Sequence, residues 1–136
     1  MKLTVIVGES HAELGDCPVV KARGGASVDC PFAAVIVGKG AEVEVSSALG
    51  VIADGSSFRQ KLPRGIQLIT CGISPKNTVS VTSRTSDRLT LALNRSVRTA
   101  SGVCEPLEQP VDAAEDEDEY DIMAAFAARI ILGLPE

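Results

Sequence analysis

Short apolar runs separated by glycine and proline dominate the first half of the chain. They occupy residues 3–7, 33–37, 51–54 and 66–71. Apolar residues occupy both the odd and the even positions of these runs, which is typical of strands buried on both faces of a parallel sheet. The pattern therefore predicts an α/β fold with a small, Rossmann-like and mostly parallel sheet at its core.

The segments between these runs are predicted to be short helical or loop connections. Residues 8–15 can begin a brief helix, and residues 56–62 can form one or two helical turns before Pro63. Residues 41–45 alternate polar and apolar side chains like a half-exposed strand, whereas residues 41–49 also suit a helical connection. The pattern leaves both alternatives open.

The pattern of apolar and polar residues changes after residue 78. Apolar residues alternate strictly with Ser, Thr and Asn, and Ser86-Asp87 supplies a turn between two alternating runs. That is the signature of an antiparallel hairpin, here an appendage to the parallel core. Residues 103–111 can add a third strand, whose two prolines place it at an edge of the sheet. The alternating apolar residues of the hairpin are Val79, Val81, Leu89, Leu91 and Leu93.

The last element, residues 120–132, is apolar nearly all round. Arg129 is its only charge beyond the first turn, and Gly133 supplies a C-terminal stop. A helix needs about 20 residues to span a bilayer, so this helix is predicted to be buried in the domain or against another chain. No membrane association is expected.

The elements predict a single domain, residues 1–136, because the length suits one core. Residues 1–72 are the parallel core and residues 73–111 the antiparallel strands. Residues 112–119 form an acidic linker, and residues 120–134 form the helix.

The formal charge of −5 is concentrated in one acidic ribbon. Seven acids lie within ten residues, and the rest of the chain carries +2. No basic face exists to displace counterions, so no nucleic-acid partner is predicted. The ribbon is interpreted as a solvated linker into a helix, with a cation or partner site as the alternative. Its members are Asp112, Glu115, Asp116, Glu117, Asp118, Glu119 and Asp121.

Four cysteines occur, and no two are close enough for a zinc knuckle or a redox motif. They indicate free thiols in a reducing compartment. The first apolar run is too short for a signal-peptide core, so the predicted location is cytoplasmic. The cysteines are Cys17, Cys30, Cys71 and Cys104.

Catalytic chemistry is sparse in this sequence. The only histidine, His11, is interpreted as a surface residue, although a pairing with Cys17 or Cys71 stays open. Cys71 lies on an apolar strand and is interpreted as a small core residue. No catalytic residue and no metal site are predicted.

A series of short motifs runs from residue 52 to the end of the last helix. The motifs are Ile52-Ala53-Asp54-Gly55, then Leu68-Ile69-Thr70-Cys71-Gly72-Ile73, then the hairpin, then residues 117–125 closing on Leu132-Gly133. In this order they resemble the ATP-binding domain of the Mur ligases, the enzymes that add amino acids to peptidoglycan precursors. The resemblance covers roughly the C-terminal 85 residues, and the order and spacing of the motifs carry it.

The nucleotide-binding motifs of that family are absent. The ligases hold phosphate with a loop ending in Gly-Lys-Ser/Thr, whereas Gly38-Lys39-Gly40 lacks the upstream glycine and the following hydroxyl residue. Acids within residues 117–121 stand where the family has residues that help hold the nucleotide, and acids repel a polyphosphate. The resemblance therefore implies a degenerate domain without ligase activity and without a cofactor.

Two functions fit this sequence. The first is a non-catalytic interaction or self-associating module, which binds a second copy or a protein partner through the C-terminal helix. The resemblance implies a link to cell-wall metabolism for it. The second is a domain that binds a nucleotide or a UDP-sugar at the carboxyl ends of its parallel strands, near Gly8, Gly38 and Asp54. Arg84 and Arg88 on the hairpin are further candidates for binding an anion.

Overall fold

The protein is built mainly from strands. A computed structural model describes residues 2–134, which contain twelve strands and one helix. Strands make up 42% of these described residues and the helix 11%, so β-structure supplies most of the core. The strands are β1 (Leu3–Val7), β2 (Val19–Ala22), β3 (Ala26–Asp29), β4 (Ala33–Val37), β5 (Val43–Ser47), β6 (Gly50–Asp54), β7 (Leu68–Cys71), β8 (Val79–Arg84), β9 (Arg88–Leu93), β10 (Val97–Thr99), β11 (Gly102–Cys104) and β12 (Leu107–Asp112), and the helix is α1 (Glu119–Leu132).

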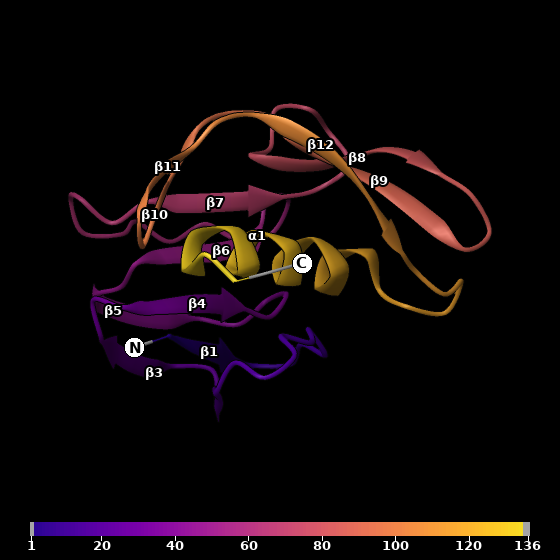
Figure 1. The fold of residues 1–136 in the computed structure, drawn as a ribbon. Coiled ribbons are helices and arrows are strands. Elements are labelled where there is room, and N and C mark those ends of the chain that lie inside the picture. Colours follow the sequence, from indigo (N-terminus) through magenta and orange to yellow (C-terminus); the bar gives the residue numbers. More distant parts are fainter. Residues whose placement is uncertain (1, 135–136) are drawn as a thin grey trace.

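Eight of the strands form one large sheet in the order β12-β9-β8-β7-β6-β4-β1-β2. Neighbours from β2 to β8 run parallel, whereas β8, β9 and β12 run antiparallel. Strands β3 and β5 form a small parallel sheet, and β10 and β11 form a separate hairpin. Figure 1 shows α1 lying across the large sheet, with β12 arching over the helix.

The fold is a β-solenoid, and the predicted Rossmann-like α/β fold is wrong. Strands β4, β6 and β7 begin at Ala33, Gly50 and Leu68, so successive coils advance by 17 and 18 residues. Between β4 and β6 the chain passes through β5 in the second sheet. The single helix of residues 2–134 follows the last strand, whereas helices connect the parallel strands of a Rossmann-like fold.

Two different layers cover the faces of the parallel strands. On one face Val35 and Val51 pack with Val45 of the small sheet, and on the other face Ile36 and Ile52 pack in the cluster that contains α1. All five residues of β4 are buried as a result. The apolar runs thus indicated two-sided burial, but such a pattern does not say whether helices or strands cover a face.

The predicted helical connections are loops or a strand. Residues 8–15 and 56–62 contain turns and bends but no helix. Of the two alternatives for residues 41–49 the strand is present as β5, whose valines face inward. The loop after β6 is held beside β5, because the Gln60 side chain accepts from the Val43 amide at 2.8 Å and donates to its carbonyl oxygen at 2.6 Å.

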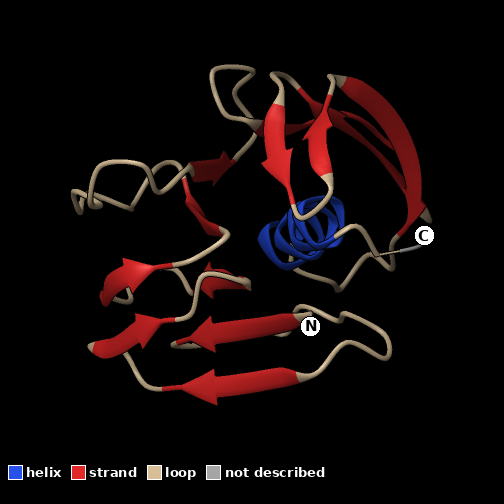
Figure 2. Ribbon diagram, turned by 60° about the vertical axis from the view of Figure 1, so that its left-hand side comes forward, coloured by secondary structure: helices blue, strands red, loops and turns tan. Residues whose placement is uncertain are grey.

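The hairpin and the last helix lie where the sequence placed them. β8 and β9 pair antiparallel on either side of the turn at residues 86–87. α1 begins after Asp118, whose side chain accepts from the Tyr120 amide, and ends at Gly133 in the left-handed conformation. Figure 2 shows the helix on one side of the strands, partly enclosed by the antiparallel strands. Within residues 2–134 the structure has no helix with the length and apolar character needed to span a membrane.

Candidate binding groove

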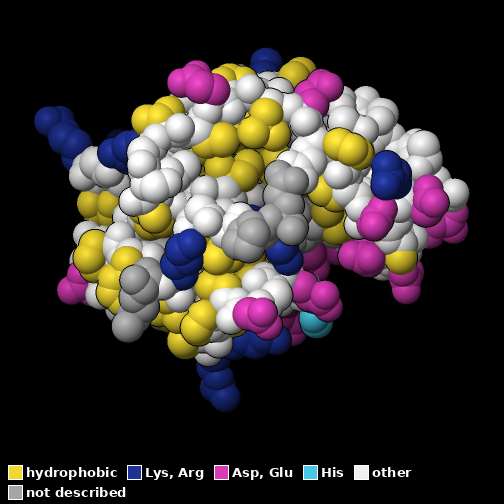
Figure 3. All heavy atoms as spheres, viewed as in Figure 1, with side chains coloured by type: hydrophobic (Ala, Val, Ile, Leu, Met, Phe, Trp, Pro, Cys, Tyr) yellow, Lys and Arg dark blue, Asp and Glu magenta, His cyan; other side chains and the backbone are white. Residues whose placement is uncertain are grey.

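A groove lies along the side of α1 that faces away from the core. It has a volume of about 960 Å³, and its walls come from β12, from the loop after β1 and from the helix itself. Such a volume is near the upper end of the range for ligand pockets, about 300–1,000 Å³. Figure 3 shows acidic side chains gathered around the hollow side of the molecule, beside apolar ones. The groove combines an apolar floor with polar walls, so it is a candidate binding site.

The loop after β1 forms one wall and is attached to the helix at two points. The Ser10 hydroxyl donates to Oδ1 of Asp121 at 2.6 Å, and the Arg129 guanidinium donates to the carbonyl oxygen of Glu13 at 3.0 Å. Leu14 is buried in the core. These contacts hold an irregular segment at a set position beside the helix, which preorganises this wall of the groove.

Strand β12 forms the opposite wall. The strand predicted at residues 103–111 is divided into β11 and β12, and β12 is an edge strand of the large sheet that pairs with β9, as Pro110 predicted. Its residues alternate between half-buried and exposed, and Leu107 and Val111 pack against the core. After the strand, the Ala113 amide donates to the carbonyl oxygen of Asp87 at 2.9 Å. The chain is therefore anchored where it turns from β12 towards α1.

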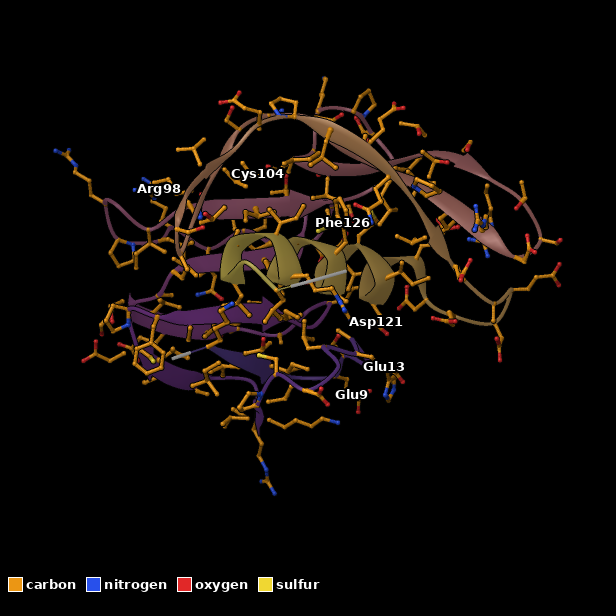
Figure 4. The ribbon with its side chains drawn as sticks, viewed as in Figure 1. Glu9, Glu13, Arg98, Cys104, Asp121 and Phe126 are labelled. Atoms are coloured by element: carbon orange, nitrogen blue, oxygen red, sulfur yellow. The ribbon has the colours of Figure 1, made fainter. Side chains whose placement is uncertain are left out.

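Side chains of α1 that the core leaves half-buried form the floor. Ile122, Ala125 and Ile130 are partly exposed, although the other face of the same helix is buried. Phe126 is 7% exposed and also lines the groove. Figure 4 shows Phe126 on the side of the helix facing β12 and Asp121 on the side facing the loop after β1. The floor is thus an apolar stripe that runs along the helix.

Carboxylates dominate the rim of the groove. The described lining residues include six carboxylates and one guanidinium, that of Arg129. Two of the acids form ion pairs, Asp112 with Arg88 at 3.3 Å and Asp118 with Lys39 at 3.7 Å. Such exposed pairs contribute little in water. The groove therefore combines an apolar floor with a negative rim, whose acids are Glu13, Asp112, Asp116, Glu117, Asp118 and Asp121.

A smaller pocket lies at the carboxyl ends of β4 and β6. It has a volume of about 300 Å³, and both Gly38 and Asp54 line it. The Asp54 carboxylate accepts from two neighbouring serine hydroxyls, at 2.9 and 3.0 Å. Gly8 is adjacent, since a Cβ added to it would lie 2.6 Å from that of Ala41, another lining residue. The structure thus brings together the three residues that the sequence placed near a ligand crevice.

The two glycines of this group have structural reasons of their own. Gly8 has a φ of +81°, a left-handed conformation that favours glycine. A Cβ on Gly38 would lie 2.4 Å from the carbonyl oxygen of Glu9. The Gly38 amide also donates to the carbonyl oxygen of Val7 at 2.8 Å. Close approach between the ends of β1 and β4 therefore accounts for both glycines without a ligand.

The two candidate anion-binding arginines line neither pocket. Arg84 forms an ion pair with Glu119 of α1, and Arg88 pairs with Asp112 of β12. Each guanidinium thus links the hairpin to a later element of the chain. The structure does not bring them to the pocket that contains Gly38 and Asp54.

Cys71 and Tyr120 are buried near the carboxyl ends of the parallel strands. Burial, and then the nearby Asp54, raises the pKa of the Cys71 thiol far above its ordinary value of 9.0. Burial, and then the nearby Cys71 and Asp54 side chains, also raises the pKa of Tyr120. The Tyr120 hydroxyl donates to the carbonyl oxygens of Val37 and Ile52. Cys71 is therefore a neutral core thiol at physiological pH, as its apolar strand predicted.

The exposed His11 lies in the loop after β1, on the wall of the groove. Within residues 2–134, no group of three or more His, Cys, Asp or Glu side chains is arranged to hold a metal ion. The acids of the rim are therefore treated as a charged surface rather than as a metal centre.

No protein-family model, curated protein or solved structure matches this chain. The resemblance of the C-terminal region to the Mur ligases stays a prediction, and the Rossmann-like architecture expected alongside it is wrong.

Sequence reasoning missed the groove, although one signal for it was present. A helix needs only one apolar face to pack on a core, so a helix that is apolar nearly all round has further apolar side chains that the core does not cover. The sequence indicated these additional apolar side chains but not where they would lie in the fold. It did not show that β12 and the loop after β1 would stand on either side of Ile122 and Ile130.

Proposed function

We propose that this protein is a non-catalytic binding module that holds a segment of a partner protein in the groove along α1. The observation that carries the proposal is the half-buried stripe of Ile122, Ala125 and Ile130, which lines a groove of about 960 Å³. Apolar side chains at such positions supply anchoring contacts, and helix-lined grooves are a recurring means of peptide recognition.

The construction of the groove supports the same function. Both walls are attached to the core or to the helix, by Leu14 and the Ser10–Asp121 bond on one side and by Val111 on the other. A partner would therefore meet a surface that is already ordered. Prior ordering lowers the entropic cost of binding, which favours recognition of short segments.

The non-catalytic part of the proposal rests on the placement of the reactive groups. Cys71 is fully buried, and Tyr120 is 3% exposed with its hydroxyl bonded to strand carbonyls. Both groups stabilise the core rather than face the groove. The four cysteines are free thiols, which supports work in a reducing compartment such as the cytoplasm.

A nucleotide or a UDP-sugar in the smaller pocket is the second candidate. The observation that favours it is the convergence of Gly38 and Asp54 at the carboxyl ends of parallel strands. The Asp54 carboxylate, however, would repel a phosphate group. The volume of about 300 Å³ is also at the lower limit for a ligand pocket. The groove is therefore the better supported site.

A peptide selection tests the proposed function. A random peptide library is selected against the wild-type protein, and enriched peptides are then titrated by fluorescence anisotropy against Ala125→Trp. The indole fills the floor of the groove at a half-buried position. We expect the affinity of the peptides to fall by at least about tenfold, which corresponds to about 1.4 kcal/mol of binding free energy.

Ser86→Trp is the matched control, because it adds the same side chain to the exposed hairpin turn outside the groove. It should bind the selected peptides like the wild type. Thermal unfolding of both variants verifies that they fold. A selection without binders, or peptides that bind Ala125→Trp and the wild type equally well, contradicts the proposal.

A further inference from the structure

The acids of the groove are distributed around its apolar floor. Glu13 lies on the wall formed by the loop after β1, Asp112 ends β12, and Asp116 and Glu117 lie in the turn that leads into α1. Negative charge therefore borders the floor on both walls and at one end. A segment seated on the floor would place its polar side chains within reach of these carboxylates.

Several rim acids already have roles within the protein. Asp121 accepts from Ser10, the side chain of Glu117 accepts from the Ala114 amide, and Asp118 caps the helix. The side chains of Glu13 and Asp116 form no hydrogen bond or ion pair with the other described residues, and both residues are exposed. These two carboxylates are therefore available to an incoming cation.

The charge of the groove is uneven along its length. Five of its six acids belong to the segment from Asp112 to Asp121, at or before the first turn of α1, whereas Arg129 lies in the last turn of the helix. The electrostatic attraction for a cationic segment is therefore strongest near the beginning of α1. Complementary charge increases the association rate and selects among partners, whereas like charge excludes an anionic segment.

The shape of the floor fits an elongated segment. α1 has 14 residues, which corresponds to a length of about 21 Å at about 1.5 Å per residue. Ile122, Phe126 and Ile130 recur along this length at intervals of four residues, the spacing of one helix face, and Ala125 lies three residues after Ile122. An amphipathic helix laid beside α1 would bring aliphatic side chains at every third or fourth position onto this stripe.

We propose, on the basis of the binding function above, that the occupant is a basic amphipathic helix of a partner protein. Its aliphatic side chains rest on Ile122, Ala125 and Ile130, and its lysines or arginines meet Glu13 and Asp116. Its positive charge is concentrated at the end that lies beside the first turn of α1. Nucleic acids and anionic membranes do not fit this rim, because both repel carboxylates.

Three fluorescein-labelled peptides of about 14 residues, the length of a helix that matches α1, test this inference. They share the same leucine positions, and their polar positions are all lysine, all glutamine or all glutamate. Anisotropy titrations are made at about 50 and about 300 mM NaCl, where screening differs strongly. We expect the lysine peptide to bind tightest and the glutamate peptide weakest, and added salt to weaken only the lysine peptide.

The double variant Glu13→Gln, Asp116→Asn tests whether the rim supplies the attraction. Each exposed pair contributes modestly, so we expect the affinity for the lysine peptide to fall about fivefold and its salt dependence to shrink. Asp16→Asn, Glu108→Gln is the matched control. It removes the same charge at exposed positions outside the groove lining and should change the affinity by less than about twofold.

The outcomes separate this inference from the binding function on which it rests. Equal binding of all three peptides, lost in Ala125→Trp, overturns the basic partner and leaves the groove as a binding site. Enrichment of acidic peptides in the selection would likewise overturn the basic partner and leave the groove as a binding site. If neither the three peptides nor any library peptide binds, both proposals are wrong. Salt-sensitive self-association that Ala125→Trp abolishes would show that a second copy, rather than a foreign helix, occupies the groove.

Discussion

The two faces of the parallel strands are covered by layers of different chemistry. On the face covered by β3 and β5, every buried residue of the cluster is valine or alanine. On the face covered by α1, the buried cluster also contains Ile, Leu, Met, Phe, Cys and Tyr. The first face holds no buried ionisable group, whereas the second contains Cys71 and Tyr120 and lies next to the groove.

The difference follows from the shapes of the covering layers. Two pleated sheets approach each other evenly, so short β-branched side chains fill the gap everywhere. A helix is a cylinder and touches a sheet along one line, which leaves wedge-shaped spaces on either side. Longer side chains fill the wedge near the core, while β12 and the loop after β1 border the outer side of the helix. A sheet layer therefore seals a face, whereas a helix layer leaves room for a site.

The largest expected effect compares two neighbouring isoleucines of α1. Ile131→Ala removes a side chain that is 0% exposed, so it should lower the free energy of unfolding by about 2–5 kcal/mol through lost burial and a cavity. Ile130→Ala removes the same atoms from the groove floor and should cost less than about 1 kcal/mol. Urea unfolding measures both values. Similar costs would mean that the groove stripe belongs to the core.

Larger side chains should also distinguish the two faces of the parallel strands, because only the face covered by β3 and β5 has no room for them. Ala53→Leu places extra atoms in the sealed valine and alanine layer, where Ala53 is 0% exposed, and should destabilise the protein by about 1–3 kcal/mol. Ala125→Leu adds the same atoms to the open groove and should change stability by less than about 0.5 kcal/mol. The comparison between the faces does not hold if thermal unfolding shows equal losses for the two variants.

Alkaline pH should destabilise the protein through the face of the parallel strands that α1 covers. Because the pKa of Cys71 is raised, the folded and unfolded chains both keep the thiol proton below the ordinary pKa, and stability is then complete. As the pH rises above about 9, the unfolded chain loses the proton while the folded chain keeps it. The free energy of unfolding should therefore fall by about 1.4 kcal/mol per pH unit from this thiol.

Cys71→Ala should flatten this loss between about pH 8 and pH 10, although the variant starts from a lower stability. Val51→Ala, a truncation at a fully buried position of the other face, should keep the full alkaline slope. Denaturant unfolding at several pH values makes the measurement. An unchanged slope in Cys71→Ala would assign the alkaline sensitivity to other groups.

The hairpin and the end of the helix were predicted correctly because their signals lie among neighbouring residues. The alternation around Ser86-Asp87 predicted the β8–β9 hairpin, and Gly133 marked the end of α1. The fold class was predicted wrongly because residues 33–37 are buried on both faces whichever element covers them. The loop before β7 was predicted to contain helical turns, but its position depends on bonds between Gln60 and Val43, which is 17 residues away in the sequence.

One of the two candidate sites could be predicted from the sequence and the other could not. The cluster of Gly8, Gly38 and Asp54 could be predicted because the carboxyl ends of parallel strands share one edge of a sheet. The groove could not be predicted, since its walls come from segments about 100 residues apart in the sequence, Glu13 and β12. Its acids were visible in the sequence, but their position around an apolar floor was not.

The sequence by itself determined the buried strands of the parallel core, the turn of the β8–β9 hairpin and the end of the helix. These properties follow from period, turn chemistry and capping, which act over a few residues. Only the tertiary structure decided that strands rather than helices cover the second face, and that Ile122, Ala125 and Ile130 line a groove. Burial removes a side chain from water without specifying its neighbour, so the identity of the covering layer depends on the whole chain.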